Sequence, residues 1–207
     1  MAIKHELFFL AQLHLQPFWI EPWQGVQILR QISCVHQTSL LWTAPFSPVL
    51  TGMRNIFQAA IPPAFQATKA SLKEFPALDG QSVSYAVLQF PAGSVNPPHT
   101  HPRPADLLLP VLVSLDVGFV DTKNSLYTQT LQTCDLFVFP KGFVHFQYNS
   151  DLNKSAVAFS AFGSANAGTV PIPGTVFNTS ISDDTLATSL SKPMLRQFQK
   201  IKYGLAA

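Results

Sequence analysis

Charged residues are scarce in this sequence. Asp, Glu, Lys and Arg make up 12% of its 207 residues, whereas hydrophobic residues make up 47%. The charged fraction is about half of the usual quarter, so the composition is not that of a disordered protein. The length predicts one domain with room for a substantial core. The formal net charge of +2 is too small and too evenly spread to indicate a nucleic-acid-binding protein.

Cysteine is also scarce, with only Cys34 and Cys134. Two cysteines cannot make a dense disulfide framework, although they could form one bond with each other. No supporting pattern surrounds either residue, so we favour two free, buried thiols.

Long apolar runs are missing as well. Near the N-terminus a short apolar patch covers residues 7–11, but Glu6 interrupts the expected basic region and Gln12 and His14 break up the apolar one. This is a poor secretory signal. The uncharged run between Arg30 and Arg54 contains polar residues and prolines, so it does not predict a membrane-spanning helix.

Proline and β-forming residues are plentiful. The 17 Pro and 17 Phe, with many Val, Thr and Ser, predict a β-rich protein with many turns. Residues 1–50 show no sustained period, and we assign residues 51–207 to the folded domain. Short strands separated by turn signals predict a β-sandwich or small barrel. The predicted strands cover 82–90, 107–120, 126–131, 135–140, 144–149 and 156–163.

The C-terminal part changes character. Ser182 is followed by two acidic residues, which is typical of a helix N-terminus. Farther on, Leu195, Phe198 and Ile201 recur at a spacing of three, and Gly204 follows a basic end. These features predict a short helical segment at the C-terminus.

The chemistry is concentrated in the stretch NPPHTHPRPAD, residues 96–106. His99 and His101 would project from the same face of a strand, because side chains alternate there. Asp106 lies in or near the next strand, and His145 lies on a strand after a turn. Three histidines and one carboxylate around one ion would suit Mn, Fe, Cu or Zn. An H-x-H pattern also occurs in strands without a metal, so the residues alone leave the question open.

The surrounding residues match a known family. The stretches NPPHTHPR, VGFVDT, DLFVFPKGFVHFQYN and AFGSANAGTV closely resemble the germin-like proteins of plants, within the cupin superfamily, over about residues 51–205. The resemblance implies an all-β cupin barrel, a double-stranded β-helix or jelly roll, with a short C-terminal helical segment. It also implies a manganese ion held by three histidines and one glutamate, a glycoprotein secreted to the cell wall space (the apoplast), and assembly into trimers or hexamers.

The resemblance assigns His99, His101, Asp106 and His145 as the metal ligands and catalytic residues. It implies superoxide dismutase-type activity, with superoxide or another small anion as the partner. A binding module, like the relatives described as auxin-binding, and a metal-poor structural cupin are the alternatives. Oxalate-oxidising relatives carry one asparagine before the Pro-Pro pair and another ten residues earlier. Asn96 matches the first, but the second is Ala86, so we do not expect oxalate oxidation.

The fourth ligand position departs from the family pattern. The family has glutamate where this chain has Asp106, and Glu6, Glu21 and Glu74 all precede the motif. Aspartate is one methylene shorter, so its carboxylate would fall roughly 1.5 Å short unless the backbone moves. Metal–oxygen distances tolerate only a few tenths of an ångström. We therefore expect Asp106 to bind through a water molecule, in a looser site.

Three backbone positions depart from the family as well. Val113 and Cys134 replace family glycines, and valine is costly if its position has positive φ. Pro110 predicts a strand edge or a bulge. Arg103 follows the histidine pair and could steer an anion toward the ion, although we favour a surface or interface contact. Phe137, Phe139 and Phe146 are predicted core or subunit-packing residues.

The resemblance leaves two expectations about the protein's location. The first 50 residues do not resemble the family's start, which has a signal peptide and a pair of cysteines. Secretion is therefore an expectation from resemblance alone. Asn153 and Asn178 begin N-glycosylation triplets, which matter only in a secreted chain.

Overall fold

The computed structural model describes residues 50, 52–57, 59–190, 199–201 and 204. All of them belong to the second of the two units into which the chain divides, residues 1–36 and 37–207. The predicted boundary near residue 50 stays a prediction.

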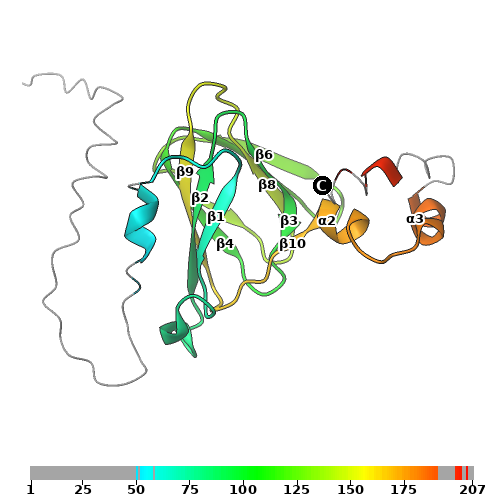
Figure 1. The fold of residues 1–207 in the computed structure, drawn as a ribbon, viewed down its shortest axis with the longest axis horizontal. Coiled ribbons are helices and arrows are strands. Elements are labelled where there is room, and N and C mark those ends of the chain that lie inside the picture. The colour runs from blue at the N-terminus through cyan, green and yellow to red at the C-terminus, as the bar shows by residue number, and fades with distance from the viewer. Residues whose placement is uncertain (1–49, 51, 58, 191–198, 202–203, 205–207) are drawn as a thin grey trace, which may run out of the picture. The chain divides into compact units, whose positions relative to one another are not determined.

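Strands dominate the described part of the chain and form two antiparallel sheets of five strands each (Figure 1). Their order is β1-β2-β9-β4-β7 in one sheet and β10-β3-β8-β5-β6 in the other. The predicted all-β architecture is confirmed. The strands are β1 (Gln66–Ala70), β2 (Ser84–Phe90), β3 (Val95–Thr100), β4 (Asp106–Leu112), β5 (Leu115–Val120), β6 (Leu126–Leu131), β7 (Phe137–Phe139), β8 (Val144–Tyr148), β9 (Ala156–Phe162) and β10 (Val170–Pro171). The helical elements are η1 (Gly52–Phe57), η2 (Pro76–Leu78), α2 (Ile172–Phe177) and α3 (Asp183–Leu190).

The core lies between the two sheets. Alternate residues of facing strands point inward, which is why the apolar residues recur at every second position. Phe90, Leu108 and Phe139 are fully buried, and Phe137 packs against this cluster. Burying each of these large side chains contributes about 1.5–3 kcal/mol. The predicted core role of Phe137 and Phe139 is confirmed.

The single strand predicted over 107–120 is wrong. The structure divides this run into β4 and β5, which belong to different sheets. Between them Val113 has a φ of 64°, a left-handed conformation that turns the chain from one sheet to the other. Both halves are apolar because both contribute to the core, so hydrophobicity does not reveal the break.

Two short strands and one α-helix, namely β1, β10 and α2, were not predicted from the sequence. The strand predicted to carry His99 is present as β3, which also includes Pro97 and Pro98. Its pairing with β8 shifts register between Asn96 and His99, and the two prolines lie within this irregularity. Prolines are tolerated there because a bulge needs fewer ladder hydrogen bonds.

The three unusual backbone positions lie together at the end of β4. The register with β9 shifts between Pro110 and Leu112, so the predicted bulge is confirmed. Cys134 has a φ of 73° and its backbone N–H donates to the Pro110 carbonyl at 2.8 Å. Positive φ costs a non-glycine residue about 1–2 kcal/mol, so both Val113 and Cys134 carry strain. Cys134 is free but exposed, so the prediction that it is buried is wrong, and Cys34 lies outside the described residues.

The predicted C-terminal helical segment is confirmed where the structure describes it, although Gly204, which was predicted to follow its end, is itself helical. Helix α3 begins at Asp183, and the Ser182 hydroxyl accepts a hydrogen bond from the Thr185 N–H at 3.2 Å. Residues 199–201 are helical, whereas Leu195 and Phe198 lie outside the described residues. Within the part of the chain that is described, no helix has the length and apolar character needed to cross a bilayer.

Candidate metal centre

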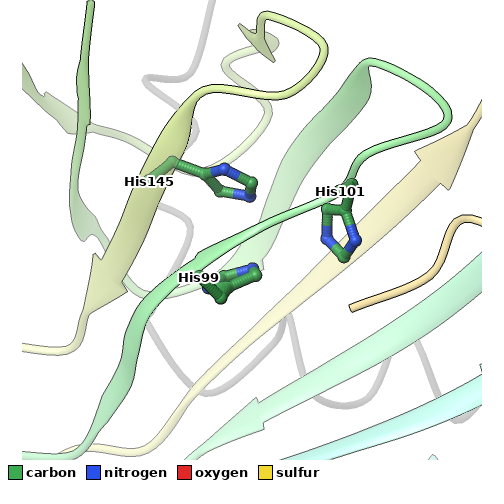
Figure 2. Close-up of side chains that lie close together, drawn as sticks. All are labelled: His99, His101 and His145. Atoms are coloured by element: carbon green, nitrogen blue, oxygen red, sulfur yellow. The ribbon is translucent and has the colours of Figure 1, made fainter. Parts of the chain in front are cut away.

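Three histidines from two neighbouring strands converge between the sheets. His99 lies on β3, His101 follows directly after it, and His145 lies on β8 opposite His99. Figure 2 shows their rings pointing toward one another. One nitrogen from each ring can be chosen so that all three lie within 4.8 Å of one another, and all three residues are buried. The predicted alternation of His99 and His101 therefore brings both imidazoles to one place.

Each ring is oriented by a backbone carbonyl on its outer side. The Nδ1 atoms of His99 and His145 lie 2.8 Å from Pro97 O and 2.9 Å from Phe143 O, respectively. A carbonyl oxygen can only accept, so each Nδ1 carries the hydrogen. That tautomer leaves Nε2 with a free lone pair, as a metal ligand requires.

The third ring is oriented by a distant part of the chain. His101 Nδ1 lies 2.8 Å from Gly168 O, which is 67 residues farther along. The same loop is held by Arg103, whose Nε and Nη2 donate to the carbonyl and the side-chain oxygen of Asn166, the second at 2.9 Å. Arg103 is thus engaged with this loop, as expected for a surface contact.

Burial keeps the three imidazoles neutral. It lowers the pKa of His99 to about 4 and that of His145 to about 3, and it lowers the pKa of His101. Smaller contributions come from neighbouring positive charges, including Lys69 for both His99 and His101. Neutral imidazoles at pH 7 have their lone pairs free for an ion.

Asp106 reaches the same space from the opposite sheet. It is the first residue of β4, and its Oδ2 lies 3.9 Å from the Nε2 atoms of both His101 and His145. Because the imidazoles are neutral, these pairs are not ion pairs. Burial raises the pKa of Asp106 to about 7, although a hydrogen bond from Ser160 Oγ at 3.4 Å opposes the shift.

The site contains buried polar atoms that lack a protein partner. Asp106 Oδ1 and His145 Nε2 have no hydrogen bond within the described residues. Such orphaned atoms are costly in a protein interior. A cation between the histidines and the carboxylate would satisfy both, so the donor set fits a divalent metal ion.

The four predicted site residues are therefore brought together, but not equally. The set in which every donor atom lies within 4.8 Å of the others contains the three histidines and not Asp106. Its Oδ2 atom is nevertheless close to two of the three histidines, His101 and His145. The expectation that aspartate is too short for the position stays a prediction.

One polar side chain near the site, Gln147, was not predicted. Gln147 is fully buried on β8, two residues after His145 and on the same face. It accepts a hydrogen bond from Asn96 Nδ2 at 2.6 Å, while its own Nε2 has no partner among the described residues. Ala86 stands where oxalate-oxidising relatives carry their second asparagine. It points inward beside Ser160, so this position holds a buried methyl group instead of an amide. The alternation of His145 and Gln147 on one strand was the signal that could have identified Gln147.

Comparisons with known proteins agree with the fold and the site. The Cupin family model matches residues 55–191. Germin-like protein 9-3 of Oryza sativa subsp. japonica is 61% identical over 141 residues, covering 68% of this chain and 65% of the rice protein. The rhicadhesin receptor of Pisum sativum is 40% identical over 196 residues, covering 93% of this chain and 87% of the pea protein.

A solved structure of recombinant oxalate oxidase in complex with glycolate has a TM-score of 0.66 and 29% identity, covering 70% of this chain and 74% of that chain. This chain spans slightly less than two thirds of the length of the rice relative. The family match covers more than half of the chain, including all four site residues. The chain belongs to the germin-like proteins of the cupin superfamily.

Proposed function

We propose that this protein binds manganese through His99, His101 and His145 and acts as a superoxide dismutase-type germin-like cupin. The observation that carries the proposal is the buried cluster of three neutral imidazoles, each with Nδ1 on a backbone carbonyl and Nε2 free. Imidazole nitrogens and a carboxylate together suit manganese among other divalent ions.

Asp106 is the fourth group of the proposed site. We propose that it contacts the ion through a water molecule, because aspartate is one methylene shorter than the glutamate of the family. Ser160 donates to Oδ2, the same oxygen that lies 3.9 Å from His101 and His145 Nε2, and so helps to orient the carboxylate. The result is a site with three firm ligands and open positions for an exogenous ligand.

The proposed reaction converts two superoxide anions and two protons into one dioxygen and one hydrogen peroxide. A bound manganese ion supplies the one-electron oxidation and reduction steps. The protein's own contribution is to hold three neutral nitrogens in place and to exclude bulk water from a buried site. His99, His101 and His145 are 3%, 6% and 1% exposed.

A second candidate is the binding of a small carboxylate at the same ion without turnover. Gln147 favours it, because its unpaired buried Nε2 offers a hydrogen-bond donor beside the histidines. Oxalate oxidation, the activity of the similar solved structure, is disfavoured because Ala86 provides no second amide. The binding candidate predicts a ligand-dependent spectroscopic change without consumption of superoxide.

The setting of the protein is proposed from the family. We assign it to the extracellular space of the plant cell wall, as a homo-oligomer. Asn153 and Asn178, the first residues of the glycosylation triplets, are both exposed, which is compatible with modification. A mobility shift on deglycosylation of the protein from plant tissue would test this placement.

The test of the activity compares two metals in one protein. The full chain is loaded with manganese or with zinc, metal content is measured, and superoxide consumption is assayed. Zinc has no redox chemistry, so the zinc form controls for the fold. We expect activity in the manganese form only. A manganese form with one ion per subunit and no activity above the zinc form would contradict the dismutase proposal and leave the binding candidate.

A further inference from the structure

Lys69 is placed unusually for a surface lysine. It lies on β1 opposite Ala86 of β2, and directly opposed residues of antiparallel strands share a face. Ala86 belongs to the buried core cluster, so the Lys69 side chain leaves its strand on the inward side. The residue is nevertheless exposed, because β1 is the edge strand of its sheet.

The Lys69 side chain bridges the two sheets at this edge. Lys69 Nζ lies 3.4 Å from Thr169 Oγ1, and Thr169 directly precedes β10, the edge strand of the other sheet. Thr169 also directly follows Gly168, whose carbonyl holds the His101 ring. The lysine is therefore anchored one residue away from a contact of the three-histidine cluster.

The ammonium retains capacity for another ligand. It has three N–H donors, and its one hydrogen bond to a described residue is the 3.4 Å contact with Thr169. Arg103, the cation that the sequence suggested for this role, has Nε and Nη2 engaged with Asn166. Both cations keep unused N–H donors, but two hydrogen bonds to Asn166 commit the Arg103 guanidinium to that loop, whereas Lys69 makes a single, longer contact.

We infer that Lys69 draws a small anion to the three-histidine site and helps to hold it there. This inference rests on the proposed function, because it assumes an ion in the site. The inference goes beyond the proposed function by naming Lys69 as the residue that makes the site favour anions over neutral ligands. The charge of Lys69 is close enough to act on His99 and His101. A positive charge close to a buried site raises the local concentration of anions and their association rate, with a strong dependence on ionic strength.

An inward-pointing lysine on an edge strand has another known use, which is to block pairing with a second sheet. The two roles make different predictions. Edge protection requires a charge of either sign and concerns aggregation. Anion attraction requires a positive charge and concerns ligand affinity at the ion.

The experiment titrates azide, a small anionic probe, into the full chain loaded with cobalt or manganese. Metal content is measured first, and binding is followed by visible absorption or electron paramagnetic resonance. We expect Lys69→Gln to weaken azide binding about threefold to tenfold, Lys69→Glu to weaken it further, and Lys69→Arg to preserve it. The affinity of the wild type should also fall more steeply with added salt than that of Lys69→Gln.

Lys73→Gln is the matched control. Lys73 is exposed in the turn after β1, beside Glu74, and the substitution changes the net charge equally. Its azide affinity should equal that of the wild type. If Lys69→Gln and Lys69→Glu hold the metal and bind azide as tightly as the wild type, the inference is overturned while the proposed function stands. A wild type that holds no ion overturns both.

Discussion

The two sheets contribute to the site in different ways. The β3 and β8 side supplies three histidines, and each ring is fixed by a carbonyl, two of them only two residues away. The β4 side supplies one carboxylate, and the departures from the family pattern cluster there at Asp106, Pro110 and Val113. The three histidines lie at or next to paired strands of one sheet and match the family pattern, whereas the carboxylate that comes from the opposite sheet is the position that departs from it.

Removal of a histidine should have the largest effect. In His145→Ala a ligand with a fixed Nε2 is lost, and we expect manganese affinity to fall by more than about 100-fold. Affinity is measured by competition with a chelator. Tyr148→Ala, at a half-buried position of the same strand, controls for damage to β8. Undiminished affinity in His145→Ala would contradict the assignment of β8 to the site.

A longer carboxylate should strengthen the weaker side of the site. Asp106→Glu restores the missing methylene, and we expect manganese affinity to rise about tenfold because the carboxylate can bind directly. Asp106→Asn should lower affinity by a similar factor. Asp135→Glu, at an exposed turn position, should leave affinity unchanged. Weaker binding in Asp106→Glu would show that aspartate already binds the ion directly.

The stability of the metal-free protein should report the buried carboxylate. The folded pKa of Asp106 is about 7, above the ordinary 3.8. Between these values the folded state holds more protons than the unfolded state, so the carboxylate costs stability as pH rises. The histidines act in the opposite sense, because their lowered pKa values cost stability as pH falls below 6.5.

Asp106→Asn separates these two contributions. It removes the carboxylate and leaves the histidines, so we expect it to stabilise the metal-free protein at pH 8 by a few kcal/mol. The gain should disappear near pH 4, where the carboxyl group of the folded wild type is already neutral. Urea unfolding at the two pH values measures both effects. An equal effect at pH 4 and pH 8 would contradict the raised pKa of Asp106.

Substitutions at the strained turn residues should change the free energy of unfolding least. Cys134→Gly relieves a φ of 73° at an exposed position, and we expect a gain of about 1 kcal/mol in the free energy of unfolding. Cys134→Ala removes the thiol but keeps the Cβ atom, so it should give no such gain. Gly142→Ala provides the converse, because Gly142 has a φ of 79° and open space around it. Its expected loss is about 1 kcal/mol.

The sequence was sufficient for the features that depend on local pattern. Period-two alternation predicted most strands and placed His99 and His101 on one face, and Ser182 predicted the start of α3. The features it did not reveal depend on contacts between distant segments. The carbonyl that holds His101 comes from Gly168, and the partner of Lys69 is Thr169. The break between β4 and β5 was also not predicted, because the residues on both sides of Val113 are equally apolar.

We infer that the three histidines suffice to hold the ion although aspartate stands at position 106 in place of the family's glutamate. The most direct test is the manganese content per subunit of the purified full chain, measured for the wild type, Asp106→Glu and His99→Ala. The account predicts close to one ion in the wild type and in Asp106→Glu, and almost none in His99→Ala. An empty wild type that fills only when Asp106 becomes glutamate would contradict it.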